Sequence, residues 1–345
     1  MIRGLTRALC AAMSLLALSG CFDSGHTAAS APAATTAHFP GARPTRLPVT
    51  TAVSVRSIPV GYGAYDVAAG SGGVWVAVSH GLTRLNTLGR VTGRVPLDNS
   101  MEWTNVSAGP GGVWYLEGNG TTHTAVVGEI SPTTLRVTRV LAVGGLHGGT
   151  AYENVAGAKD GVCVGVLTEQ ATTPVRCVGT GTGNGVINLP RVGTTRFPGV
   201  AMVTDGQRRV VVGGGAVRQV DLATGKVLTT PIPAGAVVSA VATDGPRVWA
   251  VVVHLHHPTE LWGMTGASVV RRIRLPMFFV GGMAARDGRV WLLSGRSVYA
   301  VTPAGRARVV AHVPPRSGAL AASSTALWTV EYQAGTVTRI GRATG

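Results

Sequence analysis

The feature that most constrains the fold of this chain is a short apolar sequence motif that recurs along it. The first copy reads Gly72-Gly73-Val74-Trp75-Val76. The copies follow one another roughly every 40 residues, with Gly, Asn and Asp between strand-like runs, as in the blades of a β-propeller. Four further copies carry Trp, and two weaker copies carry another residue near that position: Trp114, Trp249, Trp291 and Trp328, then Cys163 and Val211.

One unit shows how a blade is built. Val67–Ala69, Val74–Val78, Leu82–Leu85 and Arg90–Leu97 form four successive strands with period-2 alternation, which predicts an antiparallel meander. The fold class is therefore an all-β, seven-bladed propeller. By the same template the blades begin near Val67, Val106, Val155, Val200, Val238, Gly281 and Ala319.

The last of these units has only three strands before the chain ends. The strand-like segment Thr50–Ile58 lies upstream of the first blade. We expect this segment to supply the missing outer strand, since closing the ring leaves no sheet edge open. An eight-bladed or open arrangement is the less economical alternative.

The N-terminus has the pattern of a secretory signal. Arg3 and Arg7 precede an apolar run, Ala8–Leu18, which is too short to span a bilayer as a mature helix. We predict a signal peptide over residues 1–20, a flexible Ala/Thr/Pro/Ser tether over 21–49 and the propeller over 50–345. No later stretch is long and apolar enough to cross a membrane.

The end of that signal, Leu18-Ser19-Gly20-Cys21, resembles the bacterial lipobox. The resemblance implies that Cys21 is lipidated and anchors the protein to the outer face of the cytoplasmic membrane, within the cell envelope. The alternative is an ordinary signal peptide with a coincidental Cys.

The formal net charge of +15 is nearly all arginine, because Lys159 and Lys226 are the only lysines. The arginines are scattered singly, and no dense basic run or nucleic-acid motif occurs. Attraction to anionic lipid or cell-wall polymer is the favoured interpretation, and nucleic acid is not expected as a partner. A GC-rich genome is the other source of such a bias. We expect a monomer.

Two cysteines remain beyond the signal and the lipidation site. Cys163 and Cys177 lie on the neighbouring strands of a predicted hairpin, Gly161–Val166 and Pro174–Val178. In an oxidising compartment this arrangement predicts a cross-strand disulfide. A metal pair or a reactive thiol is the alternative, although no further ligands with finger spacing accompany them.

The recurrent Trp is interpreted first as core. A large apolar side chain at one position of successive blades fills the wedge between them. A ligand cage of these Trp residues is the alternative.

The meander separates two faces. Loops before the first strand and between the second and third strands lie on one face, the loop-rich face, which carries most of the His, Glu and aromatic residues. The other, the turn face, carries Gly, Ser, Thr, Pro and Asp-Gly pairs that are better explained as turn formers. Longer loops also collect polar residues without function. The distribution favours a ligand-binding face made of Tyr65, Trp103, Glu117, Tyr152, Phe197, Phe278, Glu331 and Tyr332.

The densest group on the loop-rich face is the segment 254–260. His254 and His256 point to the same side of a strand end, so they could chelate a divalent metal completed by Glu260. The same pattern also occurs without metal. Glu117 and Glu331, with His254, are candidate catalytic groups; the alternative is that the two glutamates are solvated loop carboxylates.

Two pairs of segments carry a resemblance to a known family. Val113–Glu117 with Val127–Pro132, and Leu327–Glu331 with Val337–Ile340, are similar to the repeat of streptogramin (virginiamycin B) lyase propellers and of the wider YVTN/NHL group. The resemblance implies a seven-bladed propeller. It also implies metal-assisted elimination on the funnel face, for which the available residue types are His254, His256, Glu260, Glu117 and Glu331.

We therefore expect a lipid-anchored extracytoplasmic propeller whose loop-rich face binds a small-molecule ligand, an envelope polymer or a protein partner without chemistry. A metal-dependent lyase or hydrolase on the same face is the alternative, with a divalent metal as the only cofactor considered. A third possibility is a scaffold or sensor domain that docks to envelope proteins.

Overall fold

The computed structural model divides the chain into two units, Met1–Thr50 and Thr51–Gly345. None of the first unit is described, so the predicted signal, tether and Cys21 lie outside the described residues. In the second unit the structure describes residues 53–70, 72–97, 103–109, 111–119, 124–142, 151–167, 175–179, 186–189, 201–254, 257–277, 280–302 and 305–342.

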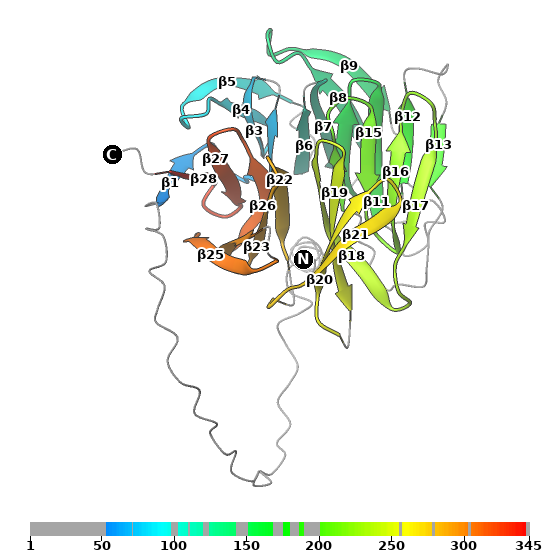
Figure 1. Ribbon diagram of the computed structural model, residues 1–345. Coiled ribbons are helices and arrows are strands. Elements are labelled where there is room, and N and C mark those ends of the chain that lie inside the picture. Colours follow the sequence, from blue (N-terminus) through cyan, green and yellow to red (C-terminus); the bar gives the residue numbers. More distant parts are fainter. Residues whose placement is uncertain are drawn as a thin grey trace, which may run out of the picture. The chain divides into compact units, whose positions relative to one another are not determined.

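The described residues form seven four-stranded antiparallel sheets, which are the blades of a propeller (Figure 1). Each blade is a meander because short Gly- and Asp-containing turns join successive strands. Blades one to three are β2 (Asp66–Gly70), β3 (Gly73–Val78), β4 (Gly81–Leu85) and β5 (Val91–Pro96); β6 (Trp103–Gly109), β7 (Gly112–Asn119), β8 (Thr124–Ile130) and β9 (Val137–Ala142); and β10 (Ala151–Ala158), β11 (Gly161–Leu167), β12 (Val175–Gly179) and β13 (Val186–Leu189).

The remaining blades repeat this order. Blades four to seven are β14 (Met202–Thr204), β15 (Arg209–Val212), β16 (Ala216–Asp221) and β17 (Val227–Pro231); β18 (Ala236–Asp244), β19 (Arg247–His254), β20 (Glu260–Thr265) and β21 (Ser268–Arg274); β22 (Gly282–Arg286), β23 (Arg289–Ser294), β24 (Ser297–Val301) and β25 (Ala307–His312); and β26 (Ser317–Ala322), β27 (Ala326–Glu331), β28 (Thr336–Arg342) and β1 (Val53–Pro59).

The first strands of successive blades contact one another in order, and β26 of the last blade contacts β2 of the first. Strand β1 pairs antiparallel with β28, from Val53 opposite Arg342 to Pro59 opposite Thr336 (Figure 1). The seven-bladed all-β prediction and closure of the ring by the N-terminal strand are both confirmed. The eight-bladed and open alternatives are wrong.

The recurrent Trp residues lie between blades. Trp75, Trp114 and Trp328 are each at most 1% exposed. Trp328, for example, packs against Val67, Val74 and Val76 of blade one in one apolar cluster. Burying each such ring contributes on the order of 2–3 kcal/mol. These side chains are core, as the repeat predicts.

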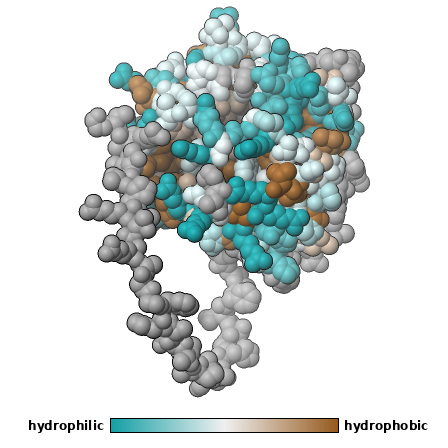
Figure 2. Space-filling model, viewed as in Figure 1, coloured by the Kyte–Doolittle hydropathy of each residue, from teal (hydrophilic) through white to brown (hydrophobic). Residues whose placement is uncertain are grey.

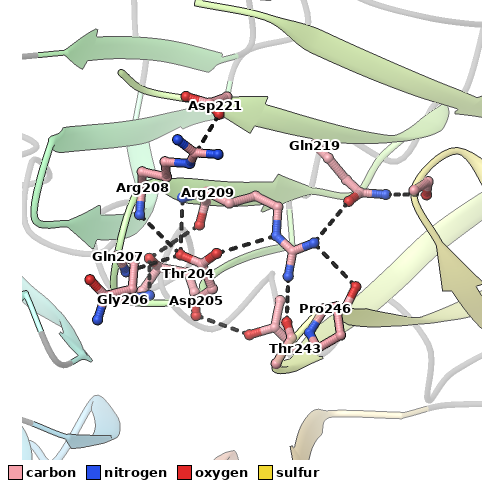
Figure 3. Close-up of polar contacts among 12 residues, drawn as sticks. Thr204, Asp205, Gly206, Gln207, Arg208, Arg209, Gln219, Asp221, Thr243 and Pro246 are labelled. Carbon is pink, nitrogen blue, oxygen red and sulfur yellow. Dashed lines mark hydrogen bonds and ion pairs between the residues drawn. The ribbon is translucent and has the colours of Figure 1, made fainter. Parts of the chain in front are cut away.

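The Asp-Gly turns of the turn face join neighbouring blades. The Asp205 carboxylate accepts hydrogen bonds from the backbone N–H groups of Gln207, Arg208 and Arg209. Arg209 forms an ion pair with Asp205 at 3.4 Å and donates to the Pro246 carbonyl of blade five at 3.2 Å (Figure 3). Asx turns of this kind provide hydrogen-bond acceptors for the backbone N–H groups of the turn, so their Asp residues stabilise the fold.

Strands β11 and β12 hold Cys163 directly opposite Cys177, and the two form a disulfide with an Sγ–Sγ distance of 1.96 Å. Both are fully buried in the cluster between blades three and four.

The surface in view in Figure 2 alternates teal and white residues with small separate brown groups. Within the residues that the structure describes, no helix is long and apolar enough to span a membrane.

Candidate functional site

The described part of the loop-rich face carries an aromatic group where blade seven meets blade one. Tyr62 and Tyr65 come from the segment between β1 and β2, and Tyr332 comes from the loop between β27 and β28. The ring centroids of Tyr65 and Tyr332 are 4.9 Å apart, and those of Tyr62 and Tyr332 are 6.5 Å apart. We call these three residues the tyrosine cluster. Tyr62 is 74% exposed and Tyr332 40% exposed, so the cluster presents aromatic surface to solvent.

Backbone hydrogen bonds from the segment between β1 and β2 to each of the two blades hold the cluster in place. Val60 N–H donates to the carbonyl of Gly335 at 3.0 Å, and Ser79 N–H donates to the carbonyl of Tyr62 at 3.0 Å. Gly335 has a positive φ of 59° and lies against the backbone of Gly61, where a side chain would collide. Glycine is therefore required for this close approach, which fixes Tyr332 beside Tyr62.

The hydroxyl groups of the cluster are also linked. Tyr65 Oη lies 3.4 Å from Ser79 Oγ. A hydrogen bond with Tyr65, then burial, then the charge of Tyr65 raise the pKa of Tyr332. Tyr332 therefore keeps a neutral hydroxyl group at physiological pH. Glu331 ends β27 beside Tyr332, and the Arg316 guanidinium donates to Gln333 Oε1 at the rim.

Glu117 lies at the next interface, between blades one and two. It is 3% exposed and shares one side of β7 with Tyr115, which is also 3% exposed. Burial, followed by the negative charge of Glu117, raises the pKa of Tyr115 to about 12. The solvated-carboxylate alternative is therefore wrong for Glu117, which is buried; its role in a site stays a prediction.

Asp66 is a half-buried acid that sequence reasoning missed. Its carboxylate accepts from Val67 N–H at 2.8 Å and, across the blade interface, from Val106 N–H at 3.1 Å. Burial raises the pKa of Asp66 to about 6, while the two backbone donors act in the opposite direction. A signal was present, because an Asx residue directly precedes Val in three successive inner strands: Asp66-Val67, Asn105-Val106 and Asn154-Val155.

The histidine segment is described in part. The His254 ring meets the His257 ring edge-on, with centroids 5.8 Å apart. Glu260 Oε2 accepts from Trp262 Nε1–H at 2.8 Å. His256 lies outside the described residues, and among those described no three His, Cys, Asp or Glu side chains are grouped to hold a metal. The metal site stays a prediction.

Other predicted members of the binding face are not described. Phe197 and Phe278 lie outside the described residues, and so do the side chains of Trp103 and Tyr152. Of the predicted face, the structure brings Tyr65, Glu331 and Tyr332 together and places Glu117 at the neighbouring interface.

No protein-family model matches the sequence, and no curated protein matches it significantly. Solved structures do. A chain of a mitotic checkpoint complex aligns with a TM-score of 0.61 at 16% identity, covering 94% of this chain and 99% of that one. The β-propeller domain of Cps50 (Swd1) from Myceliophteria thermophila aligns with a TM-score of 0.58 at 10% identity, covering 84% and 100%.

A third similar chain comes from the hydrazine synthase of Kuenenia stuttgartiensis, with a TM-score of 0.54 at 15% identity and coverage of 82% and 96%. At these identities the similarity shows the propeller fold alone.

Proposed function

We propose that this chain is an exported, lipid-anchored propeller that binds a protein partner on its loop-rich face, without chemistry. The observation that carries the proposal is the tyrosine cluster. Tyr62 and Tyr332 expose large rings to solvent, while backbone hydrogen bonds tie the segment that carries Tyr62 to blades one and seven. Tyr is enriched at the centres of protein interfaces, and a surface that is already ordered loses little entropy on binding.

One of the structural comparisons is consistent with a protein partner. One similar chain belongs to a mitotic checkpoint complex, which is an assembly of proteins. An aromatic surface with hydroxyl groups and an adjacent arginine, Arg316, matches the composition of interface centres.

The anchor is proposed from the N-terminal sequence. The segment Leu18–Cys21 follows an apolar run of signal-peptide length. A Cys21→Ser chain expressed in a bacterium is expected to move from the membrane fraction to the soluble fraction. Retention of this variant in the membrane would contradict lipidation at Cys21.

Partner binding is tested by crosslinking the full chain in intact cells and recovering it. A Tyr62→Ala/Tyr332→Ala variant is expected to lose the partner that the wild type recovers, and binding of the purified partner should weaken about tenfold or more. Leu88→Ala/Val270→Ala is the matched control, since both side chains are exposed apolar residues away from the cluster, at 62% and 66%. Equal recovery by the tyrosine variant would refute the proposal.

Metal analysis separates this function from the metal-dependent lyase predicted as the alternative. The binding role predicts that the purified full chain holds no stoichiometric divalent metal. One equivalent of metal that is lost in His254→Ala/His256→Ala would favour the enzyme instead.

A further inference from the structure

Some blades are joined by a long side chain from their third strand. In blade one Arg84 lies opposite Trp75, and its guanidinium is 5.7 Å from the ring centroid. The same guanidinium donates from Nη1 to the carbonyl of Pro132 in blade two at 2.9 Å. Arg84 thus covers the Trp and binds the next blade through one side chain.

Two other blades repeat this arrangement. Arg339 lies opposite Trp328 in blade seven, 5.8 Å from the ring centroid, and donates from Nε to the carbonyl of Thr87 at 3.0 Å. Gln219 of blade four donates to the carbonyl of Gly266 in blade five (Figure 3). Each acceptor lies in the turn between the third and fourth strands of the next blade. We call Arg84, Gln219 and Arg339 the clamp residues.

Blade five has no side chain at this position, because the residue opposite Trp249 is Gly263. A cavity of about 430 Å³ lies there, between blades five and six on the turn face. Thr302, which begins the turn where a clamp would reach blade six, also lines it. Its apolar wall is formed by Trp249, Ile273 and Val290. Its charged rim is formed by Arg247, Arg271 and Arg289. We call this cavity the blade-five pocket.

The rim of the blade-five pocket is strongly cationic. Arg247 and Arg289 have no carboxylate within ion-pair distance in the described part of the chain. The one acid in the lining, Asp287, has an 84% exposed side chain and lies 3.6 Å from Arg286 Nε. The lining therefore carries three guanidinium groups and one carboxylate, and this excess of positive charge attracts an anion.

Counting a neighbouring acid, Asp244, still leaves an excess of one positive charge at the rim. Both carboxylate oxygens of Asp244 accept backbone N–H groups of the blade-six turn, from Asp287 and Gly288. The Arg271 guanidinium lies beside the same blade, since its Nη2 is 3.7 Å from the Cβ position of Gly305. The cations thus surround the place that a clamp side chain fills in other blades.

The wall includes an aromatic ring. In blades one and seven a planar guanidinium lies over the Trp ring, whereas in blade five the Trp249 ring packs directly against Gly263 and also lines the pocket. The volume lies within the range of small-molecule sites, and apolar walls with a few polar anchors are their usual lining. Arginine forks bind planar carboxylates through paired hydrogen bonds.

We propose that the blade-five pocket binds a flat organic anion, with an aromatic body against Trp249 and a carboxylate between Arg247 and Arg289. The site lies on the turn face, so it is independent of partner binding at the tyrosine cluster.

The test is calorimetric titration of the purified full chain with 2-naphthoate, using 2-naphthalenemethanol as the neutral probe and inorganic phosphate as the anion without a ring. We expect one molecule of 2-naphthoate to bind per chain, at least about tenfold more tightly than either of the other probes. Arg247→Glu/Arg289→Glu should weaken it by at least about tenfold. Arg296→Glu/Arg308→Glu, which makes the same charge change at exposed residues outside the pocket, should leave it unchanged.

Failure of 2-naphthoate to bind, or equal binding by the Arg247/Arg289 variant, would overturn the proposal. Equal affinity for the neutral probe or for phosphate would overturn the requirement for a flat anion. Tyr62→Ala/Tyr332→Ala should bind 2-naphthoate like the wild type, so a failure of the proposed protein interface leaves this result untouched.

Discussion

The interface between blades seven and one and the interface between blades five and six are built from the same repeat and differ at the position opposite the recurrent Trp. At the first, Arg339 covers Trp328 and bonds to Thr87, and the interface is filled. At the second, Gly263 leaves Trp249 beside a cavity. The comparison teaches that the repeat supplies the ring, and that distinct surfaces arise where a blade departs from the repeat, by a longer loop or by a missing side chain.

The largest expected effect comes from removing the two Trp rings. Trp328→Ala should lower the free energy of unfolding by about 3–5 kcal/mol, because a fully packed ring is replaced by a void. Trp249→Ala should cost roughly half as much, since this ring already borders a cavity and loses fewer contacts. Urea denaturation followed by circular dichroism measures both. An equal loss of unfolding free energy at the two positions would contradict the proposed difference in packing between the interfaces.

The next effect depends on pH and concerns the blade one–two interface, where a carboxylate bridges the inner strands. Because the pKa of Asp66 is raised to about 6, the folded chain holds this proton more tightly than the unfolded chain. Stability from this group is present below about pH 4 and is lost as the pH rises through 6, on the order of 2–3 kcal/mol.

Asp66→Asn should abolish that component. The measurement is the difference in unfolding free energy between wild type and variant at several pH values from 4 to 7, which cancels the other carboxylates. A difference that does not change with pH would contradict the half-buried position of Asp66.

A smaller effect is expected from a clamp residue. Arg84→Ala should lower the unfolding free energy by about 1–2 kcal/mol, because it removes a ring contact and the hydrogen bond to Pro132. Arg90→Ala is the control, since this exposed arginine has no side-chain hydrogen bond recorded in the described residues, and it should cost less than about 0.5 kcal/mol. Equal costs would mean that the clamp does not stabilise the blade interface.

The fold could be predicted from the sequence because each blade repeats one pattern. The spacing of Trp75, Trp114 and Trp328 is set by a four-stranded unit that buries one ring per interface. The period of the sequence repeat therefore also predicts which rings are buried. The strand 53–59 was predictable for a related reason, since the last blade lacked one strand.

The site was predicted in part. Face assignment placed Tyr65, Glu331 and Tyr332 on the loop-rich face, but their contact depends on Gly335 approaching Gly61 across 274 positions of the chain, which no local pattern encodes. The blade-five pocket was missed because the sequence signal for it is the lack of a side chain opposite Trp249. Gly263 stands where blades one, four and seven carry Arg84, Gln219 and Arg339, and that comparison needs the strand register.

The central claim is that protein recognition occurs on the loop-rich face. The most direct measurement replaces Tyr62, and separately Leu88, by the photo-crosslinking residue p-benzoylphenylalanine in the full chain in cells and compares the adducts after irradiation. Both positions are strongly exposed, at 74% and 62%, and Leu88 lies in the β4–β5 turn on the turn face. The account predicts a discrete protein adduct from position 62 and none from position 88. An adduct from position 88 alone, or none from position 62, would contradict it.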